Sequence, residues 1–485
     1  MGKRRAERKP GKSRAASGDG TSARKKKKPQ RSVAEDDFFD GASSEEENAA
    51  REEEVAADDG EDLEETVHEK KVRLAKAYLE KLKAKAAEEE EDQGDEEVGE
   101  DERQGRRDSV VADLLRQEQL EESGKIQRKI ASRLLLPEVP SEGNLLIRKH
   151  RLSVTALALT EDEKWGFSGS KDGLLLQWDV ETGKCFRYER PKPEKSAEAG
   201  KKPSSSRILA LAVDSSGRYL ASGGPDRSVH LWDVRTQAHI QAFPGHRGAI
   251  TSLAFRQGTT QLFSGSSDRT LKLWSAEDRS YMDTLFGHQS ELVSVDCLRQ
   301  ERVLSAGRDR TLRLWKVPEE TQLVFRGYTA SIESCCCITN GEFLSGADDG
   351  SVALWSAVRK KPVYIAKSAH GPKVEEHRNG ETSLPASCGA IEAWVGAVAT
   401  CRGSDLVASG AGDGKIQLWS VEDGNKSLKP LHTLPAKGFV NALAFARSGR
   451  FLLAGVGQEP RLGRWARNSQ AKNGVLVHKL ELASL

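Results

Sequence analysis

The sequence lacks the features that mark membrane, secreted or zinc-binding proteins. No stretch approaches the roughly 18 uninterrupted apolar residues of a membrane span, and residues 1–5 carry three basic side chains instead of the apolar core of a secretion signal. The seven cysteines are odd in number, three of them adjacent in an apolar run, and no Cys or His pair has zinc-ligand spacing. We therefore expect a soluble intracellular protein with reduced thiols and no metal.

The chain also has almost no net charge, but its positive and negative residues are segregated. Residues 1–31 hold thirteen basic and two acidic side chains, whereas residues 32–65 hold one basic and sixteen acidic. Residues 87–103 are again acidic, and residues 1–143 together sum to −9 against +10 for the remainder. Blocks of one sign repel themselves and remain solvated, so residues 1–143 are predicted to form a largely disordered charged tail.

Residues 144–485 contain a repeated pattern of Ser, Asp and Trp. In six segments Asp follows Ser by four positions and Trp follows Asp by six: Ser168, Asp172, Trp178; Ser222, Asp226, Trp232; Ser264, Asp268, Trp274; Ser305, Asp309, Trp315; Ser345, Asp349, Trp355; and Ser409, Asp413, Trp419. A seventh, weaker copy has Gly455, Glu459 and Trp465 in these places. Successive tryptophans are spaced around the ~40–45 residues of a four-stranded propeller blade, and short alternating strands lie between them.

This pattern resembles the WD-repeat family, which implies an all-β fold, a seven-bladed WD40 β-propeller over residues 144–485. In that family a His, the Ser, the turn Asp and the Trp form a hydrogen-bonded chain inside each blade. The matching sets are His246, Ser264, Asp268, Trp274; His288, Ser305, Asp309, Trp315; and His150, Ser168, Asp172, Trp178. The fifth blade has Tyr328 where the His would be, and the second and sixth show no obvious His.

The recurrence of Ser, His and Asp suggests a catalytic triad, but six copies cannot all be active sites. We expect these side chains to satisfy buried polar groups and to hold each blade together. The sequence contains no nucleophile elbow and no phosphate-cradling Gly-rich loop. We therefore predict a protein that is not an enzyme and has no cofactor or small-molecule substrate.

Two segments could supply the outer strand that closes the ring. Residues 145–148 precede the first His, and residues 474–482 follow the last Trp. One of them is expected to complete the seventh blade and the other to cap a sheet edge, since an open edge invites aggregation. The sequence does not decide between them.

The predicted fold gathers basic residues on one rim, where the turns between the second and third strands of each blade meet the connections between blades. The candidate RNA- or partner-binding residues of this rim are Arg151, Lys171, Arg227, Arg247, Arg269, Arg308 and Arg310. Two long inserts, residues 191–206 and about 368–390, belong to the same rim, and long loops on a rigid scaffold often carry function. Such a rim suits phosphate contacts, although Asp followed by Arg is also ordinary turn composition in this family.

The tail contains several candidate signals. The basic clusters of residues 1–31 predict nuclear localisation or a nucleic-acid-binding arm, and they comprise Lys3, Arg4, Arg5, Lys25, Lys26, Lys27 and Lys28. Ser43 and Ser44 each precede Glu by three positions and are candidate phosphorylation sites. Apolar residues at helical spacing predict helices over about 66–86 and 108–136, the latter including Ile126, Ile130 and Leu134 on one face.

The whole chain, including residues 168–173 and 393–398, resembles the WD-repeat proteins of the U3 small nucleolar ribonucleoprotein, a ribosomal RNA-processing family. That resemblance implies localisation in the nucleus and nucleolus and binding to the box B/C region of U3 small nucleolar RNA. The implied protein partners are a small box C/D RNA-binding protein and other small-subunit processome proteins, and the implied role is pre-rRNA processing for the small ribosomal subunit.

Two other functions stay open on the sequence. Residues 232–235, Trp-Asp-Val-Arg, resemble the short motif by which WD40 substrate receptors dock on cullin-type ubiquitin ligases. The acidic tracts alternatively suggest a nuclear histone-binding scaffold. Sequencing the RNA that co-purifies with the protein distinguishes these functions from the first.

Overall fold

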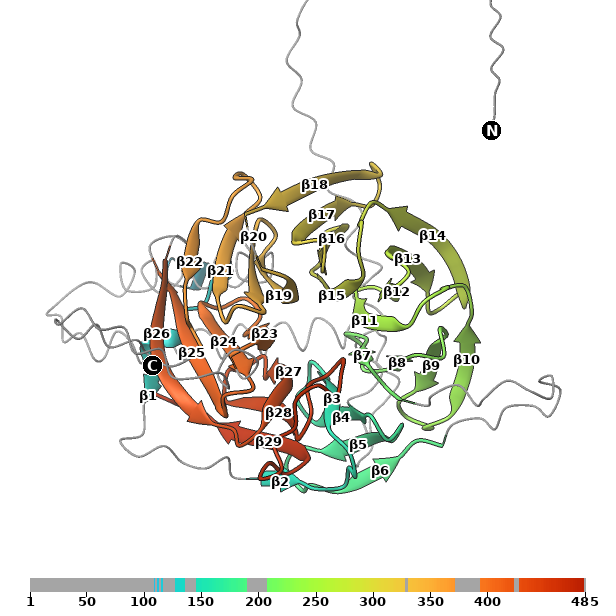
Figure 1. Cartoon of the computed structure of the whole chain (residues 1–485), viewed down its shortest axis with the longest axis horizontal. Coiled ribbons are helices and arrows are strands. Elements are labelled where there is room, and N and C mark those ends of the chain that lie inside the picture. Colours follow the sequence, from blue (N-terminus) through green and yellow to red (C-terminus); the bar gives the residue numbers. More distant parts are fainter. Residues whose placement is uncertain are drawn as a thin grey trace, which may run out of the picture. The chain divides into compact units, whose positions relative to one another are not determined.

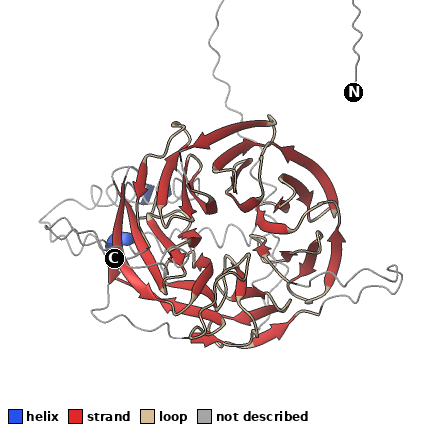
Figure 2. Cartoon of the chain, viewed as in Figure 1, coloured by secondary structure: helices blue, strands red, loops and turns tan. Residues whose placement is uncertain are grey.

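The computed structural model describes residues 109, 111–112, 115–116, 127–135, 145–189, 207–327, 330–370, 393–422 and 427–483. The tail signals at residues 1–103, Tyr328 and the two long inserts fall outside these residues, except for the first residues of the second insert, Ser368–His370. Within the described part of the chain, the strands form seven four-stranded antiparallel sheets and one two-stranded sheet. The seven sheets are arranged around a common axis as the blades of a propeller, as Figures 1 and 2 show.

Six blades follow one another along the chain, each running from an inner to an outer strand. Their strands are β3 (Val154–Leu159), β4 (Trp165–Ser170), β5 (Leu175–Asp179) and β6 (Cys185–Arg187) in blade 1; β7 (Ala210–Val213), β8 (Tyr219–Gly223), β9 (Val229–Asp233) and β10 (His239–Phe243) in blade 2; β11 (Ile250–Phe255), β12 (Gln261–Ser266), β13 (Thr270–Ser275) and β14 (Ser280–Phe286) in blade 3; β15 (Leu292–Cys297), β16 (Arg302–Gly307), β17 (Thr311–Lys316) and β18 (Thr321–Arg326) in blade 4; β19 (Ile332–Thr339), β20 (Glu342–Ala347), β21 (Val352–Ser356) and β22 (Tyr364–Ala366) in blade 5; and β23 (Val395–Thr400), β24 (Leu406–Ala411), β25 (Lys415–Glu422) and β26 (Ser427–Pro435) in blade 6.

Blade 7 joins the two ends of the propeller. Its three inner strands are β27 (Phe439–Phe445), β28 (Phe451–Gly457) and β29 (Gly474–Lys479), and its outer strand is β2 (Leu145–Ile147). The earlier segment, residues 145–148, therefore supplies the outer strand, and residues 474–479 form the third strand. This arrangement removes the open sheet edge that an unclosed ring would leave.

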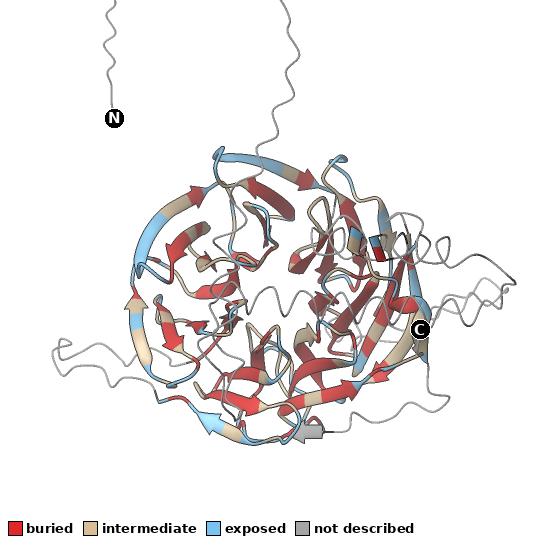
Figure 3. Cartoon of the chain, turned by 180° about the vertical axis from the view of Figure 1, so that it is seen from behind, coloured by how far each residue is buried: buried red, intermediate tan, exposed pale blue. Residues whose placement is uncertain are grey.

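The hydrophobic core lies between the blades. Each buried cluster combines apolar side chains of two neighbouring sheets; Phe167 of blade 1, for example, packs in one cluster with Leu220 and Trp232 of blade 2. The cluster of Val154, Leu453 and neighbouring residues joins blade 7 to blade 1 in the same way. Burial accordingly decreases from the inner strands to the outer ones, as Figure 3 shows. Since removing one blade would expose the cores on both of its sides, the whole ring is stabilised as a unit.

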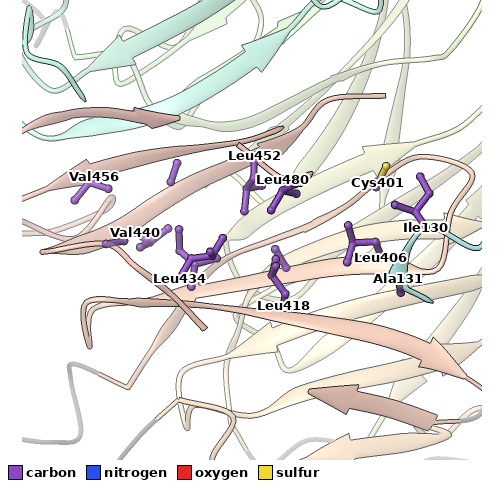
Figure 4. Packing of buried hydrophobic residues seen from close by; sticks show 14 residues of the cluster. Ile130, Ala131, Cys401, Leu406, Leu418, Leu434, Val440, Leu452, Val456 and Leu480 are labelled. Carbon is purple, nitrogen blue, oxygen red and sulfur yellow. The ribbon is translucent and has the colours of Figure 1, made fainter. Parts of the chain in front are cut away.

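A segment before the first blade also packs on the propeller. Residues 127–130 are not helical; they lead into a 3-10 turn, η2 (Ala131–Arg133), and a short strand, β1 (Leu134–Leu135), that pairs with β30 (Glu481–Leu482). Ile130 and Ala131 are buried in the cluster between blades 6 and 7 beside Cys401 and Leu406, as Figure 4 shows. We call residues 127–135 the strap.

The strap corrects the prediction of a helix through residues 126–134. The amides of Ile130 and Ala131 donate to one carboxylate oxygen of Asp405, at 2.8 and 3.0 Å, so they do not form helical hydrogen bonds. Arg128 donates its guanidinium Nη2 to the carbonyl oxygens of Arg402 and Arg447, both at 2.8 Å. The four-residue spacing of Ile130 and Leu134 serves packing on the propeller here. Further upstream, Ser109, Val111, Ala112, Leu115 and Arg116 are helical, and Val111 is buried.

Candidate nucleic-acid interface

The Ser, His, Asp and Trp side chains form complete hydrogen-bonded chains in blades 3 and 4. In blade 3 the indole of Trp274 donates to Ser264 at 2.8 Å, Nε2 of His246 lies 2.7 Å from the same hydroxyl, and Nδ1 of His246 lies 2.9 Å from Asp268. The corresponding distances in blade 4, through Trp315, Ser305, His288 and Asp309, are 2.8, 2.8 and 3.0 Å. Each serine is fully buried, and its hydroxyl is hydrogen-bonded to both the tryptophan and the histidine, so these groups hold the blade together.

The turn aspartates of these two blades are strongly stabilised as carboxylates. Burial alone would raise the pKa of Asp268, but hydrogen bonds from His246, Thr270 and the amide of Arg247 outweigh it and hold the pKa far below its usual value. The pKa of Asp309 is lowered in the same way, with His288 as the strongest of its hydrogen-bonding partners. The carboxylate of each Asp accepts a hydrogen bond from the Nδ1–H of its histidine.

Blade 6 contains the same complete chain, which corrects a prediction: the indole of Trp419 donates to Ser409 at 2.9 Å. Blade 6 does have a histidine: His370 lies 2.8 Å from Ser409 and 3.1 Å from Asp413. It precedes the serine by 39 positions instead of about 18, because the second insert separates them. In blade 1, His150 contacts Ser168 at 2.8 Å, but the indole nitrogen of Trp178 has no hydrogen-bond partner, so its chain is incomplete.

The prediction that Trp465 takes the tryptophan position of the seventh repeat is wrong. Gly455 of β28 pairs with Val475, and Leu453 pairs with Val477, which is the register that places Leu262 opposite Trp274 in blade 3. Val477 therefore occupies the tryptophan position of blade 7. Trp465 instead lies on the loop between β28 and β29, residues 458–473, which we call the blade-7 loop.

The turns between second and third strands lie beside the connections between blades, and we call the surface that they form together the upper rim. Its two kinds of loop touch each other: the amide of Arg151 donates to Asp172 and that of Arg247 to Asp268, both at 2.9 Å. Arg151 and Arg247 are themselves exposed. The structure thus brings these two predicted residues to the surface beside the turns between second and third strands.

Three of the predicted arginines occupy an unfavourable backbone conformation. Arg227, Arg269 and Arg310 directly follow the turn aspartates of blades 2, 3 and 4, with φ of 66°, 70° and 62°, and their side chains are exposed. The equivalent residue of blade 1 is Gly173, with φ 83°. Glycine adopts this left-handed conformation without strain, whereas other residues pay roughly 1 kcal/mol or more. The fold does not require arginine there, so these side chains are candidates for function.

Two predicted rim residues are held by acidic partners. The side chain of Lys171 is 3% exposed, and its Nζ lies 3.1 Å from Glu459 and 2.6 Å from the carbonyl oxygen of Gly463. Arg308 lies 3.2 Å from Glu291 and 3.5 Å from Glu333. Lys171 is thus not presented to solvent, and Arg308 reaches a phosphate only in competition with two carboxylates.

The blade-7 loop contributes rim residues that the repeat pattern did not reveal. Arg464 and Arg467 are exposed, and the indole of Trp465, 48% exposed, lies 5.7 Å from that of Trp394. Exposed aromatic side chains between arginines are the composition of single-strand stacking surfaces. The available signal was the 18-residue gap between Gly455 and the next apolar strand, far longer than the corresponding gap in the other blades.

The side chain of Arg461 extends from this loop across the central channel. Its guanidinium Nη2 donates to the carbonyl oxygen of Val293 in blade 4 at 3.0 Å and also to that of Thr251 in blade 3. Inner strands of several blades line this channel, which encloses about 320 Å³. Arg461 therefore connects blade 7 with the opposite side of the ring.

Comparison with known proteins places these features in a family. The WD domain, G-beta repeat, matches residues 144–179, 200–233, 237–275, 279–316, 319–356 and 384–420. The U3 snoRNP-associated protein-like EMB2271 of Arabidopsis thaliana is 47% identical over 87% of this chain and 88% of its own length. The U3 small nucleolar RNA-interacting protein 2 of Mus musculus is 41% identical over 85% and 82%.

A solved structure agrees with the sequence comparisons. The structure of U3-55K covers 70% of this chain and 100% of its own, with 41% identity and a TM-score of 0.63. The all-β propeller, the six matched repeats and these relatives lead to one assignment. The chain belongs to the family of WD-repeat proteins associated with the U3 small nucleolar ribonucleoprotein.

Proposed function

We propose that this protein is a non-enzymatic component of the U3 small nucleolar ribonucleoprotein that binds the box B/C region of U3 small nucleolar RNA through its upper rim. The observation that carries this proposal is the set of exposed arginines in the left-handed conformation, Arg227, Arg269 and Arg310. The names of the relatives, which include an RNA-interacting protein, support the choice of ligand.

The charges of the upper rim suit recognition of an RNA backbone. The turn aspartates accept hydrogen bonds from within the blade, and the side chains of Asp268 and Asp309 are only 10% and 8% exposed. The neighbouring arginines extend into solvent, so a polyanion approaching the rim meets positive charge first. Structured RNA is recognised mainly by shape and backbone, for which a rigid ring of arginines is suited.

The proposed partners follow from the same assignment. A small box C/D RNA-binding protein and other small-subunit processome proteins would lie beside the RNA, and the basic residues at 3–5 and 25–28 would direct nuclear import toward the nucleolus. Deleting residues 1–31 and following the protein by fluorescence in cells tests the import role. Unchanged nuclear accumulation would contradict it.

The sharpest test reverses charge on one rim and compares it with the other. The variant Arg227→Glu, Arg269→Glu, Arg310→Glu should lose U3 RNA on purification from cells, and its affinity for the transcript should fall about tenfold or more. The control reverses three exposed arginines on the opposite rim, Arg235, Arg402 and Arg450, with the same change in net charge. Equal losses in both variants would show that only net charge matters and would contradict the proposed interface.

The competing functions receive no specific support from the structure. In the Trp-Asp-Val-Arg motif, Trp232 is fully buried. The carboxylate of Asp233 accepts a hydrogen bond from the backbone amide of Arg235 at 2.8 Å and so caps a turn. Asp179 caps the matching turn of blade 1 in the same way. The motif therefore has a structural role in its blade. Recovery of a ligase adaptor or histones, without U3 RNA, would favour these alternatives.

A further inference from the structure

The blade-7 loop has a more buried half, residues 458–463, which is partly buried, and a more exposed half. Arg461 and Leu462 line a small hollow that Trp465 also borders, and Glu459 contacts blade 1, whereas Arg464 and Trp465 are 57% and 48% exposed. A 16-residue loop without strands of its own would be costly to order on binding. Its conformation before binding therefore depends on what holds the buried half.

One side of the buried half is held by blades 1 and 7. Lys171 donates to Glu459 and to the carbonyl oxygen of Gly463. The hydroxyl of Ser153 accepts a hydrogen bond from the backbone amide of Glu459 at 3.0 Å, and the side chain of Asn441 donates to the carbonyl oxygen of Glu459 at 3.1 Å. Burial lowers the pKa of Lys171, while the hydrogen bond and charge of Glu459 act in the opposite direction. Lys171 thus lies buried against the loop and away from solvent.

The other side is held by Arg461 through its two carbonyl acceptors in blades 3 and 4. Glu333 of blade 5 lines the same hollow, and its charge attracts both Arg461 and Arg308. Burial and the negative charges of Asp348 and Glu291 raise the pKa of Glu333, whereas the positive charges of Arg308 and Arg461 lower it. The loop is consequently fixed at two points on opposite sides of the channel mouth, and Arg464, Trp465 and Arg467 follow directly from this fixed part.

We propose that Lys171 and Arg461 are positioning residues that fix the blade-7 loop over the channel mouth, so that Arg464, Trp465 and Arg467 are presented to RNA in one conformation. This inference rests on the proposed function for the identity of the ligand. It assigns to Lys171 a role different from the phosphate contact that its place in the sequence predicts. Lys171 acts on RNA only through the loop.

The partner of Lys171 gives a test in which the two roles predict opposite results. If Lys171 contacts phosphate, Glu459→Ala frees both Lys171 and Arg464, which lies 3.5 Å from the same carboxylate, and removes a negative charge from the rim, so RNA binds more tightly. If Lys171 positions the loop, the same substitution releases it, and affinity falls about fivefold. The matched control is Glu291→Ala, which removes an exposed carboxylate beside Arg308 on the same rim and should tighten binding slightly.

The experiment uses the full chain and a transcript of U3 small nucleolar RNA. Hydrogen exchange of residues 458–473 is measured on the free protein, together with the exchange of β11 to β14 as a reference for folding. Weaker binding of Glu459→Ala with faster exchange confined to the loop supports the inference. Tighter or unchanged binding, or unchanged loop exchange in both Glu459→Ala and Lys171→Met, overturns it. If the wild-type protein binds no U3 RNA, the proposed function fails, while loop exchange still tests the positioning.

Discussion

Blades 3 and 7 differ in how they hold the segment between their second and third strands in place. Blade 3 fixes its short turn between second and third strands from within, through Trp274, Ser264, His246 and Asp268. Blade 7 has none of these contacts, and its 16-residue loop is fixed by Lys171 of blade 1 and by its own Arg461, which donates to backbone carbonyls of blades 3 and 4. The internal chain keeps a turn short and rigid, whereas its loss allows a blade to carry a long loop that extends over the ring.

The largest expected effect comes from breaking the internal chain of blade 3. Ser264→Ala leaves the indole of Trp274 and Nε2 of His246 without a buried partner, which should lower the free energy of unfolding by about 3 kcal/mol. Ser168→Ala in blade 1 is the control, because Trp178 does not hydrogen-bond to that serine, and its cost should be smaller by about 1 kcal/mol. Urea unfolding followed by tryptophan fluorescence measures both. Equal costs would mean that the chain does not act as described.

Acid should affect the two blades at different pH. In blade 7, burial lowers the pKa of His478 to about 4, below the 6.5 of the unfolded chain. The unfolded state therefore binds more protons, so this contribution is present above pH 6.5 and is lost as the pH falls toward 4, by up to about 3 kcal/mol. Asp268 of blade 3 has a depressed pKa, and its contribution is lost only below about pH 4.

Two substitutions separate these contributions. His478→Phe should flatten the dependence of stability on pH between 6.5 and 4, whereas Asp268→Asn should flatten it only at lower pH. Unfolding midpoints in urea across this range provide the measurement. A His478→Phe variant with the wild-type slope between pH 6.5 and 4 would contradict the burial of a neutral His478.

Shortening the blade-7 loop should reduce RNA affinity more than stability. Replacing residues 463–470 with two glycines removes Arg464, Trp465 and Arg467, and affinity for U3 RNA should fall by about tenfold or more, because stacking contributes ~1–3 kcal/mol per base. The free energy of unfolding should change by less than about 1 kcal/mol, because these residues are exposed. Filter binding and urea unfolding give the two quantities. A variant that loses stability but keeps its affinity for RNA would show that the loop of blade 7 stabilises the fold and does not bind RNA.

The smallest effect concerns the left-handed arginines. Arg310→Gly should raise the free energy of unfolding by about 1 kcal/mol, because glycine adopts φ of 62° without strain. The same substitution should weaken RNA binding by removing one phosphate contact. The slope of the logarithm of the binding constant against the logarithm of salt concentration should fall in magnitude by about one. Gly173→Arg in blade 1 is the converse control. If Arg310→Gly is destabilising, the arginine has a structural role that outweighs its backbone strain.

The sequence predicted the blades well because Ser, Asp and Trp recur at fixed spacing, and in five of the six copies the Trp indole donates to the buried Ser. It failed where spacing and three-dimensional register disagree. Trp465 matches the interval of the repeat, but the pairing of β28 with β29 gives its place to Val477. His370 precedes Ser409 by 39 positions, so the usual spacing of the repeat does not reveal it.

The candidate site was predicted only in part, for a similar reason. Arg227, Arg269 and Arg310 lie where the repeat places them, since their turns are short and local. Lys171 occupies an equivalent turn, yet Glu459, 288 positions away, holds it. The strap was mistaken for a helix because residues spaced by four fit both a helix and a segment packed against two blades. Such long-range partners are absent from any local pattern.

The closure of the ring has a consequence for how the protein is made. The strap is synthesised early, but its partners lie in blades 6 and 7 and beyond them: its amides bind Asp405, and Arg133 donates to the carbonyl oxygen of Ala483, 350 positions later. At roughly 5–20 residues per second, the ribosome needs about 20–70 s to supply them. Until blades 6 and 7 have been made, β2 and the apolar face of the strap have no complete partner. Newly made chains are therefore most vulnerable to aggregation while still attached to the ribosome, and a chaperone that shields residues 127–147 would act at that stage.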